Sequence, residues 1–199
     1  MDTQKIQQSA EEAVTRFLQR APLEESALIL DGMGVNSAYH YFVLSALGID
    51  RLEKLRYFCS VSAGTFPLLF FWGYKKGYAT VSIEELKNWD KWNRQAHRIP
   101  PLFYLIQFGF SRLFPNKKGF MPAEGFSRAL GRIVKPEFLA LRVAELPANF
   151  RIPLYNVTEK KLEIVEKANP KFAAMTVSEL LCAAPAIEGI FPPVRFNGC

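Results

Sequence analysis

Apolar positions along the chain follow two spacings, one typical of helices and one typical of buried strands. Thr3–Arg20 has apolar residues at every third or fourth position, which predicts an amphipathic N-terminal helix within residues 1–22. Ala27–Leu30 and Leu55–Cys59 are short apolar runs of the kind that form buried strands. A loop and an apolar segment with helical spacing follow each run, and these segments are Ala38–Leu47 and Phe66–Tyr74. This alternation predicts an α/β fold.

The second half of the chain continues the mixture of helices and strands. Pro136–Leu146 is predicted to be a helix that starts near its proline, because proline suits the first helical turn. Phe150–Val157 and Leu162–Glu166 are predicted to be two strands joined by a turn. The pattern S/T-x-x-E is a helix-starting capping box, and it occurs at Ser82–Glu85 and at Thr176–Glu179.

Composition indicates one globular domain over residues 1–199, since 199 residues with 49% hydrophobic content can form one sizeable core. The net charge of +6 suits solubility, an anionic membrane surface or acidic ligands. Nucleic acid is not an expected partner, because no more than two Lys or Arg residues are consecutive and no nucleic-acid-binding motif occurs. The oligomeric state does not follow from the sequence.

The cysteine pattern and the N-terminus indicate a cytoplasmic protein. Cys59, Cys182 and Cys199 have neither metal-site nor disulfide-framework spacing, so we expect free thiols, a reducing compartment and no metal. Met1–Gln8 is polar, unlike a signal peptide, and no apolar run reaches the ~20 residues of a membrane-spanning helix. Contact with a membrane would therefore be peripheral.

Ser62 lies between the second predicted strand and the helix after it. The pentapeptide Ser60–Gly64 matches the G-x-S-x-G nucleophile elbow with serine in place of the first glycine. Such a turn forces its central serine into a strained conformation and needs small residues two positions away on either side. An ordinary strand–loop–helix connection would have the same local pattern, and the pentapeptide alone does not separate the two.

A glycine-rich loop, Asp31-Gly32-Met33-Gly34, follows the first predicted strand. Glycines after a strand let backbone N–H groups face an anion without hindrance from side chains. The two loops together suggest an oxyanion hole beside a nucleophile.

These motifs resemble those of the patatin-like phospholipases, which share a D-G-G-G-x-R/K-G loop, a G-x-S-x-G serine and a distant D-G-G/A aspartate. Asp31–Ser37 matches the first motif in register, with Met33, Asn36 and Ser37 replacing a glycine, a basic residue and the last glycine. Leu180–Val194 resembles the stretch that leads to the aspartate in this family.

The resemblance implies a three-layer α/β/α domain with a central, mostly parallel sheet, and a serine acyl hydrolase for lipid esters. Ser62 would be the nucleophile, and backbone N–H groups of Gly32, Met33 and Gly34 would form the oxyanion hole. The family aspartate would lie beyond residue 199, so we expect these 199 residues alone to be inactive. No cofactor is implied. The alternative is an inactive patatin-like domain that binds lipid or a protein partner.

Ile99–Phe114 is rich in aromatic residues and bounded by prolines. In the family that the chain resembles, this region covers the active site. The resemblance implies that Phe103, Phe108 and Phe110 would contact acyl chains by burying apolar surface. An oligomer contact or ordinary core packing fits the same composition. Trp89 and Trp92 suit a lipid interface or, more simply, partly buried packing.

A Ser-His-Asp triad from Ser62, Asp90 and His97 has the chain order of α/β-hydrolases. Asp90 and His97 are only seven positions apart, however, whereas that fold places the two residues on separate loops. We therefore favour the Ser-Asp chemistry of the resemblance. His40, within a predicted helix, is interpreted as a packing or partly exposed residue.

Overall fold

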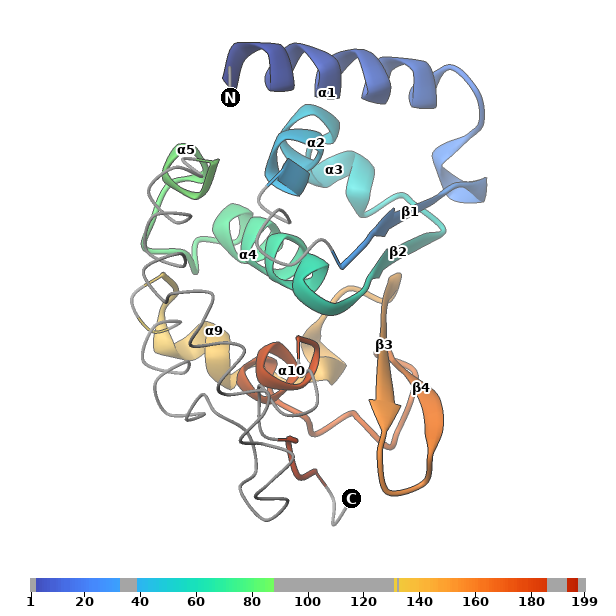
Figure 1. Cartoon of the computed structure of the whole chain (residues 1–199), viewed down its shortest axis with the longest axis vertical. Coiled ribbons are helices and arrows are strands. Elements are labelled where there is room, and N and C mark those ends of the chain that lie inside the picture. The colour runs from blue at the N-terminus through green and yellow to red at the C-terminus, as the bar shows by residue number, and fades with distance from the viewer. Residues whose placement is uncertain (1–2, 33–38, 88–130, 132, 186–192, 197–199) are drawn as a thin grey trace, which may run out of the picture.

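The computed structural model describes residues 3–32, 39–87, 131, 133–185 and 193–196, and these residues form a mixed α/β fold (Figure 1). The helices and strands in chain order are α1 Thr3–Leu18, β1 Ala27–Leu30, α2 His40–Leu47, α3 Ile49–Leu52, β2 Tyr57–Ser60, α4 Thr65–Lys75, α5 Ile83–Lys87, α9 Pro136–Ala140, β3 Phe150–Asn156, β4 Lys161–Val165 and α10 Val177–Ala183. Short 3-10 turns occupy Leu23–Glu25, Ser62–Gly64 and Val143–Glu145.

The described strands form one four-stranded, mostly parallel sheet in the order β1-β2-β3-β4. Strands β1 and β2 run parallel with Leu30 opposite Ser60, β2 and β3 are also parallel, and β3 and β4 form an antiparallel hairpin. Because parallel strands end at the same edge of a sheet, the loops that follow β1 and β2 emerge side by side. This topology brings the glycine loop and the serine turn together.

One face of the sheet packs against helices to form the core. Leu30, Phe58 and Phe150 from β1, β2 and β3 are at most 2% exposed and belong to the same cluster as the buried residues of α2, α4, α9 and α10. Helix α4 is buried from Pro67 through Gly73, as expected for a helix that is apolar on all sides. Helix α1 packs on α2 through Ala10 and Val14.

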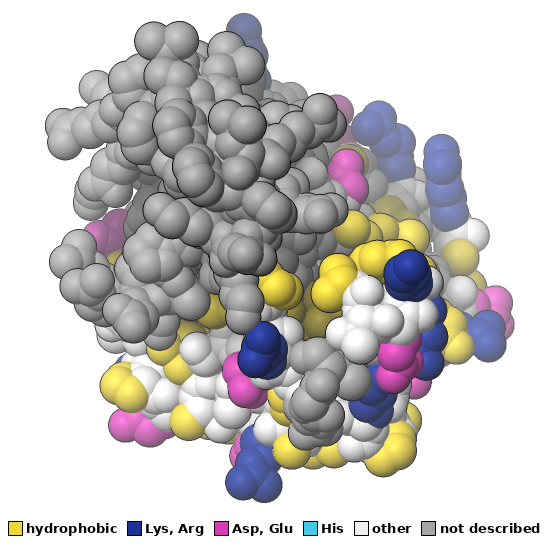
Figure 2. All heavy atoms as spheres, turned by 60° about the horizontal axis from the view of Figure 1, so that its bottom comes forward, with side chains coloured by type: hydrophobic (Ala, Val, Ile, Leu, Met, Phe, Trp, Pro, Cys, Tyr) yellow, Lys and Arg dark blue, Asp and Glu magenta, His cyan; other side chains and the backbone are white. Residues whose placement is uncertain are grey.

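The opposite face of the sheet exposes apolar side chains. Ile29 is 64% exposed, and Tyr57 and Ile164 are each 38% exposed. The guanidinium carbons of Arg56 and Arg151 lie 5.4 and 5.2 Å from the centre of the Tyr57 ring. The end of the molecule that Figure 2 brings forward also shows hydrophobic side chains at the surface among charged ones.

Most of the predicted elements are confirmed among the described residues, but the prediction of a helix over Pro136–Leu146 is wrong beyond Ala140. Helix α9 ends there because Arg142 forms an antiparallel bridge with Thr176 instead. The Val143 N–H donates to Met175 O, and the Val177 N–H donates to Leu141 O, each at 2.8 Å. These long-range bonds replace the helical ones.

Candidate functional site

Ser62 begins the turn that joins β2 to α4, and its backbone is strained as the motif predicts. Its φ angle is +51°, a left-handed conformation that costs a residue with a side chain about 1–2 kcal/mol. The 3-10 turn Ser62–Gly64 continues directly into α4, so the Ser62 side chain lies at the N-terminal end of a buried helix. Ser62 is partly exposed. No hydrogen bond of its hydroxyl group occurs among the described residues.

Gly32 lies against Ser62. A Cβ atom added to Gly32 would be 2.8 Å from Ser62 Cβ and 3.5 Å from Ser62 Oγ. This approach follows from the parallel pairing of β1 and β2, whose last link is the hydrogen bond from Val61 N–H to Leu30 O at 2.9 Å. A side chain at position 32 would collide with the serine, so only glycine lets the backbone come this close.

The packing around the turn explains why small residues occupy positions 60 and 64, on either side of Ser62. A Cβ added to Gly64 would be 2.5 Å from Asp31 O and 2.6 Å from Leu30 O, which are backbone atoms at the end of β1. Ser60 is fully buried, and its hydroxyl group donates to Thr65 Oγ1 at 3.2 Å. The Thr65 partner explains how a serine replaces the usual glycine without leaving a buried polar group unpaired.

His40 and Asp31 form a contact that our interpretation of the sequence missed. His40 Nε2 lies 3.2 Å from Asp31 O and 3.2 Å from Asp31 Oδ1. The His40 side chain is 11% exposed, whereas the Asp31 side chain is 71% exposed. The sequence predicted a packing or partly exposed histidine, because a spacing of nine residues gives no indication that His40 contacts Asp31.

The structure therefore brings together Ser62 and Gly32 of the predicted site residues. Met33 and Gly34, which complete the predicted oxyanion loop, lie outside the described residues. The same is true of the aromatic residues predicted to contact acyl chains and of the other residues weighed as alternatives: Phe103, Phe108, Phe110, Trp89, Trp92, Asp90 and His97.

No metal site is present in the described part of the chain, where no three His, Cys, Asp or Glu side chains are grouped to hold an ion. Cys59 and Cys182 are free thiols. Burial raises the pKa of both thiols, and the positive charge of Arg151 opposes this rise at Cys59. A raised pKa keeps a thiol protonated at neutral pH, so neither cysteine is activated as a nucleophile.

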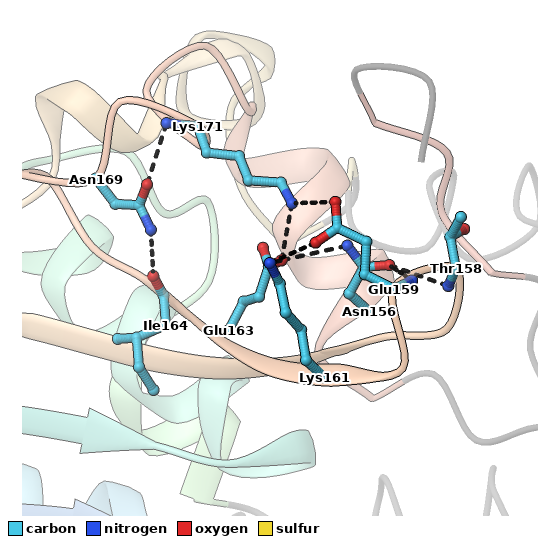
Figure 3. A network of polar contacts seen from close by, with 8 residues as sticks. All are labelled: Asn156, Thr158, Glu159, Lys161, Glu163, Ile164, Asn169 and Lys171. Atoms are coloured by element: carbon cyan, nitrogen blue, oxygen red, sulfur yellow. Dashed lines mark hydrogen bonds and ion pairs between the residues drawn. The ribbon is translucent and has the colours of Figure 1, made fainter.

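Polar contacts on the β3–β4 hairpin form a separate, structural network (Figure 3). Lys171 Nζ lies 2.8 Å from Glu163 Oε1 and 3.3 Å from Glu159 Oε1, and Lys161 contacts the same two carboxylates. Asn156 Oδ1 accepts hydrogen bonds from the backbone of the hairpin turn. The hydrogen bond from Lys171 is the largest influence that lowers the pKa of Glu163 to about 2. The network ties the hairpin to the segment before α10.

A cavity of about 310 Å³ lies between α1 and the α2–α3 corner, with Val14, Ala46 and Arg51 among its lining residues. It includes none of the predicted site residues. None of the helices among the described residues has the length and apolarity needed to cross a membrane. Comparison of the chain with protein-family models, with curated proteins and with solved structures gave no match.

Proposed function

We propose that this chain carries the nucleophile and part of the oxyanion hole of a serine acyl hydrolase that acts on lipid esters, of the patatin-like kind. The observation that carries the proposal is the pairing of a serine at φ +51° with a glycine backbone in contact with its side chain. A reactive hydroxyl group needs both a prominent position and nearby backbone donors for the charge that develops on the carbonyl oxygen.

In the proposed reaction, Ser62 Oγ attacks the ester carbonyl carbon and forms a tetrahedral intermediate. Backbone N–H groups of the loop that begins at Gly32 stabilise the oxyanion, with Met33 and Gly34 as the further expected donors. The proton of the serine passes to a general base, which the resemblance predicts to be an aspartate beyond residue 199. Collapse of the intermediate releases the alcohol, and water then frees Ser62 from its acyl group.

The three-layer α/β/α arrangement belongs to this proposal too. The described helices α2, α4, α9 and α10 contribute to the core on one face of the sheet, while Ile29 and Tyr57 on the other face are exposed. Parallel sheets are usually covered on both faces, which is consistent with a further layer. Phe103, Phe108 and Phe110 are proposed to contact the acyl chain.

A fluorophosphonate probe tests the proposal, because it labels only serines whose hydroxyl group is activated. Ser62→Ala is compared with Ser178→Ala, which removes another partly exposed serine near the start of a helix. Labelling is measured on these 199 residues and on any longer product that the gene encodes. Since a missing general base reduces rates by about 10²–10⁴-fold, we expect slower labelling of the 199 residues if the longer product supplies the aspartate.

We expect Ser62→Ala to abolish labelling and Ser178→Ala to leave it unchanged. A full-length product that shows no Ser62-dependent labelling would refute the hydrolase proposal.

A second candidate function is a non-catalytic interaction domain, and the exposed sheet face favours it. Arg151 is paired with Glu166 on this face, whereas Arg56 has no carboxylate partner among the described residues. The proposed occupant is therefore a protein segment with apolar side chains and a carboxylate for Arg56. In cells that depend on the gene, Ile29→Lys would abolish this function and Ser62→Ala would not, which is the reverse of the expectation for a hydrolase.

A further inference from the structure

The Asp31–Gly32 peptide lies between the end of β1 and the site, and its carbonyl oxygen is held on two sides. On one side, His40 Nε2 lies 3.2 Å from Asp31 O. On the other side, the Gly64 backbone is so close that an added Cβ atom would be 2.5 Å from the same oxygen. His40 is the first residue of α2, so the histidine is itself fixed by a helix whose Phe42 and Leu44 are buried.

The orientation of this peptide determines where the Gly32 N–H points. A peptide group is planar and trans, so its C=O and N–H point in opposite directions and turn together. Glycine places little restriction on the rotation of the peptides next to it. A hydrogen bond to Asp31 O therefore limits the direction of the N–H of Gly32, the residue that contacts Ser62.

The contact also assigns the tautomer of the histidine. A carbonyl oxygen only accepts hydrogen bonds, so Nε2 must carry the proton when it bonds to Asp31 O. Asp31 Oδ1, at 3.2 Å from the same nitrogen, is a second acceptor for that proton. Both contacts need the Nε2–H donor.

We propose that His40 is a positioning residue, which holds the Asp31–Gly32 peptide through its Nε2–H so that the Gly32 N–H keeps one orientation beside Ser62. The link to catalysis rests on the proposed function, in which this N–H belongs to the oxyanion hole. The positioning itself is a property of the fold and is measurable without any reaction.

The test compares His40→Gln with His40→Leu. The Gln side chain places an N–H donor at about the position of Nε2, whereas Leu removes the donor, and both residues favour helices to a similar extent. The NMR order parameter of the Gly32 N–H, which reports how freely that bond reorients, is the first measurement. We expect a lower order parameter in His40→Leu and a value close to wild type in His40→Gln, and nitrogen NMR shifts of wild-type His40 should show a protonated Nε2.

The rate of Ser62 labelling by the fluorophosphonate is the second measurement. Loss of a whole oxyanion donor costs about 10²–10³-fold in rate, so misorientation of one donor is expected to cost about 10–100-fold in His40→Leu. His40→Gln should restore most of this loss. A merely structural role of the ring would show no such rescue, since Gln does not replace its shape.

The two measurements separate the two proposals. If Ser62 is unreactive in every protein while the Gly32 order parameter follows the donor at position 40, the hydrolase proposal fails and the positioning role stands. If the Gly32 order parameter is unchanged in His40→Leu, or if the wild-type Nε2 is not protonated, the positioning role is wrong whatever Ser62 does. A His40→Gln variant with the Gly32 order parameter and the labelling rate of His40→Leu would also overturn it.

Discussion

Gly64 is the position where the packing of the serine turn is tightest, and a single methyl group tests it. Its φ and ψ angles of −63° and −18° are ordinary for alanine, so Gly64→Ala introduces no backbone strain. The new Cβ atom would lie 2.5 Å from Asp31 O, 2.6 Å from Leu30 O and 3.0 Å from the Leu30 carbonyl carbon. All three are backbone atoms, so the end of β1 must move away from the turn.

The size of the effect is the difference between two terms. Gly→Ala at a permitted conformation stabilises a protein by about 0.4–1 kcal/mol, because alanine restricts the unfolded chain. Overpacking of a well-packed site costs about 1–3 kcal/mol, and contacts with backbone make the upper end appropriate here. We therefore expect a net loss of about 2 kcal/mol in the free energy of unfolding.

Urea denaturation measures this loss, and Gly77→Ala is the matched control. Gly77 has a φ angle of +81° and no atom within 4 Å of an added Cβ, so its alanine variant suffers conformational strain without a clash. Amide exchange of Val61 gives a local measurement, because its N–H donates to Leu30 O at 2.9 Å. After correction for the change in global stability, amide exchange at Val61 should be faster than wild type in Gly64→Ala and equal to wild type in Gly77→Ala.

Two results would refute this reasoning. The first is a Gly64→Ala variant that is as stable as the wild type with unchanged Val61 exchange, which would mean that the strand and the turn are not in contact. The second is an equal acceleration of Val61 exchange in both variants after correction for global stability, which would mean that the effect is not local to the turn.

Two further predictions concern the sheet and its hairpin. Leu30 is 1% exposed and Ile29 is 64% exposed, so Leu30→Ala should cost about 2–5 kcal/mol in urea denaturation and Ile29→Ala less than about 1 kcal/mol. Equal costs would contradict the assignment of the two faces. The pKa of Glu163 is lowered from 4.5 to about 2 in the folded state, so its pairing with Lys171 stabilises the fold fully above pH 4.5 and is lost as the pH falls through about 2. The stability difference between wild type and Glu163→Gln should therefore be largest at neutral pH and shrink across this window, and a constant difference would show that the carboxylate charge is irrelevant.

Local patterns predicted much of the fold because the interactions that form these elements lie within a few residues. The strand prediction Ala27–Leu30 is confirmed without change, and Gly48 ends α2 with a φ angle of +80°, as a C-terminal glycine is expected to do. Both capping boxes form, with Glu85 bonded to Ser82 and Glu179 bonded to Thr176. The helix prediction for Pro136–Leu146 failed because the structure there depends on long-range interactions. Hydrogen bonds to the distant segment 175–177 overrode the local preference for a helix.

The candidate site also has features that the local sequence predicted and features that only the fold determined. The sequence by itself placed Ser62 on a strand-to-helix turn, because an apolar strand pattern precedes it and an apolar helical pattern follows it. The left-handed backbone of Ser62 is a feature of the structure, since an ordinary connection has the same local pattern. Only the tertiary structure decided that the Gly32 backbone touches the serine and that His40 reaches Asp31. Those contacts depend on the parallel register of β1 and β2 and on the position of α2, which are set by burial in a shared core. The spacing of residues along the chain does not predict such contacts, since residues far apart in sequence become neighbours only when that core forms.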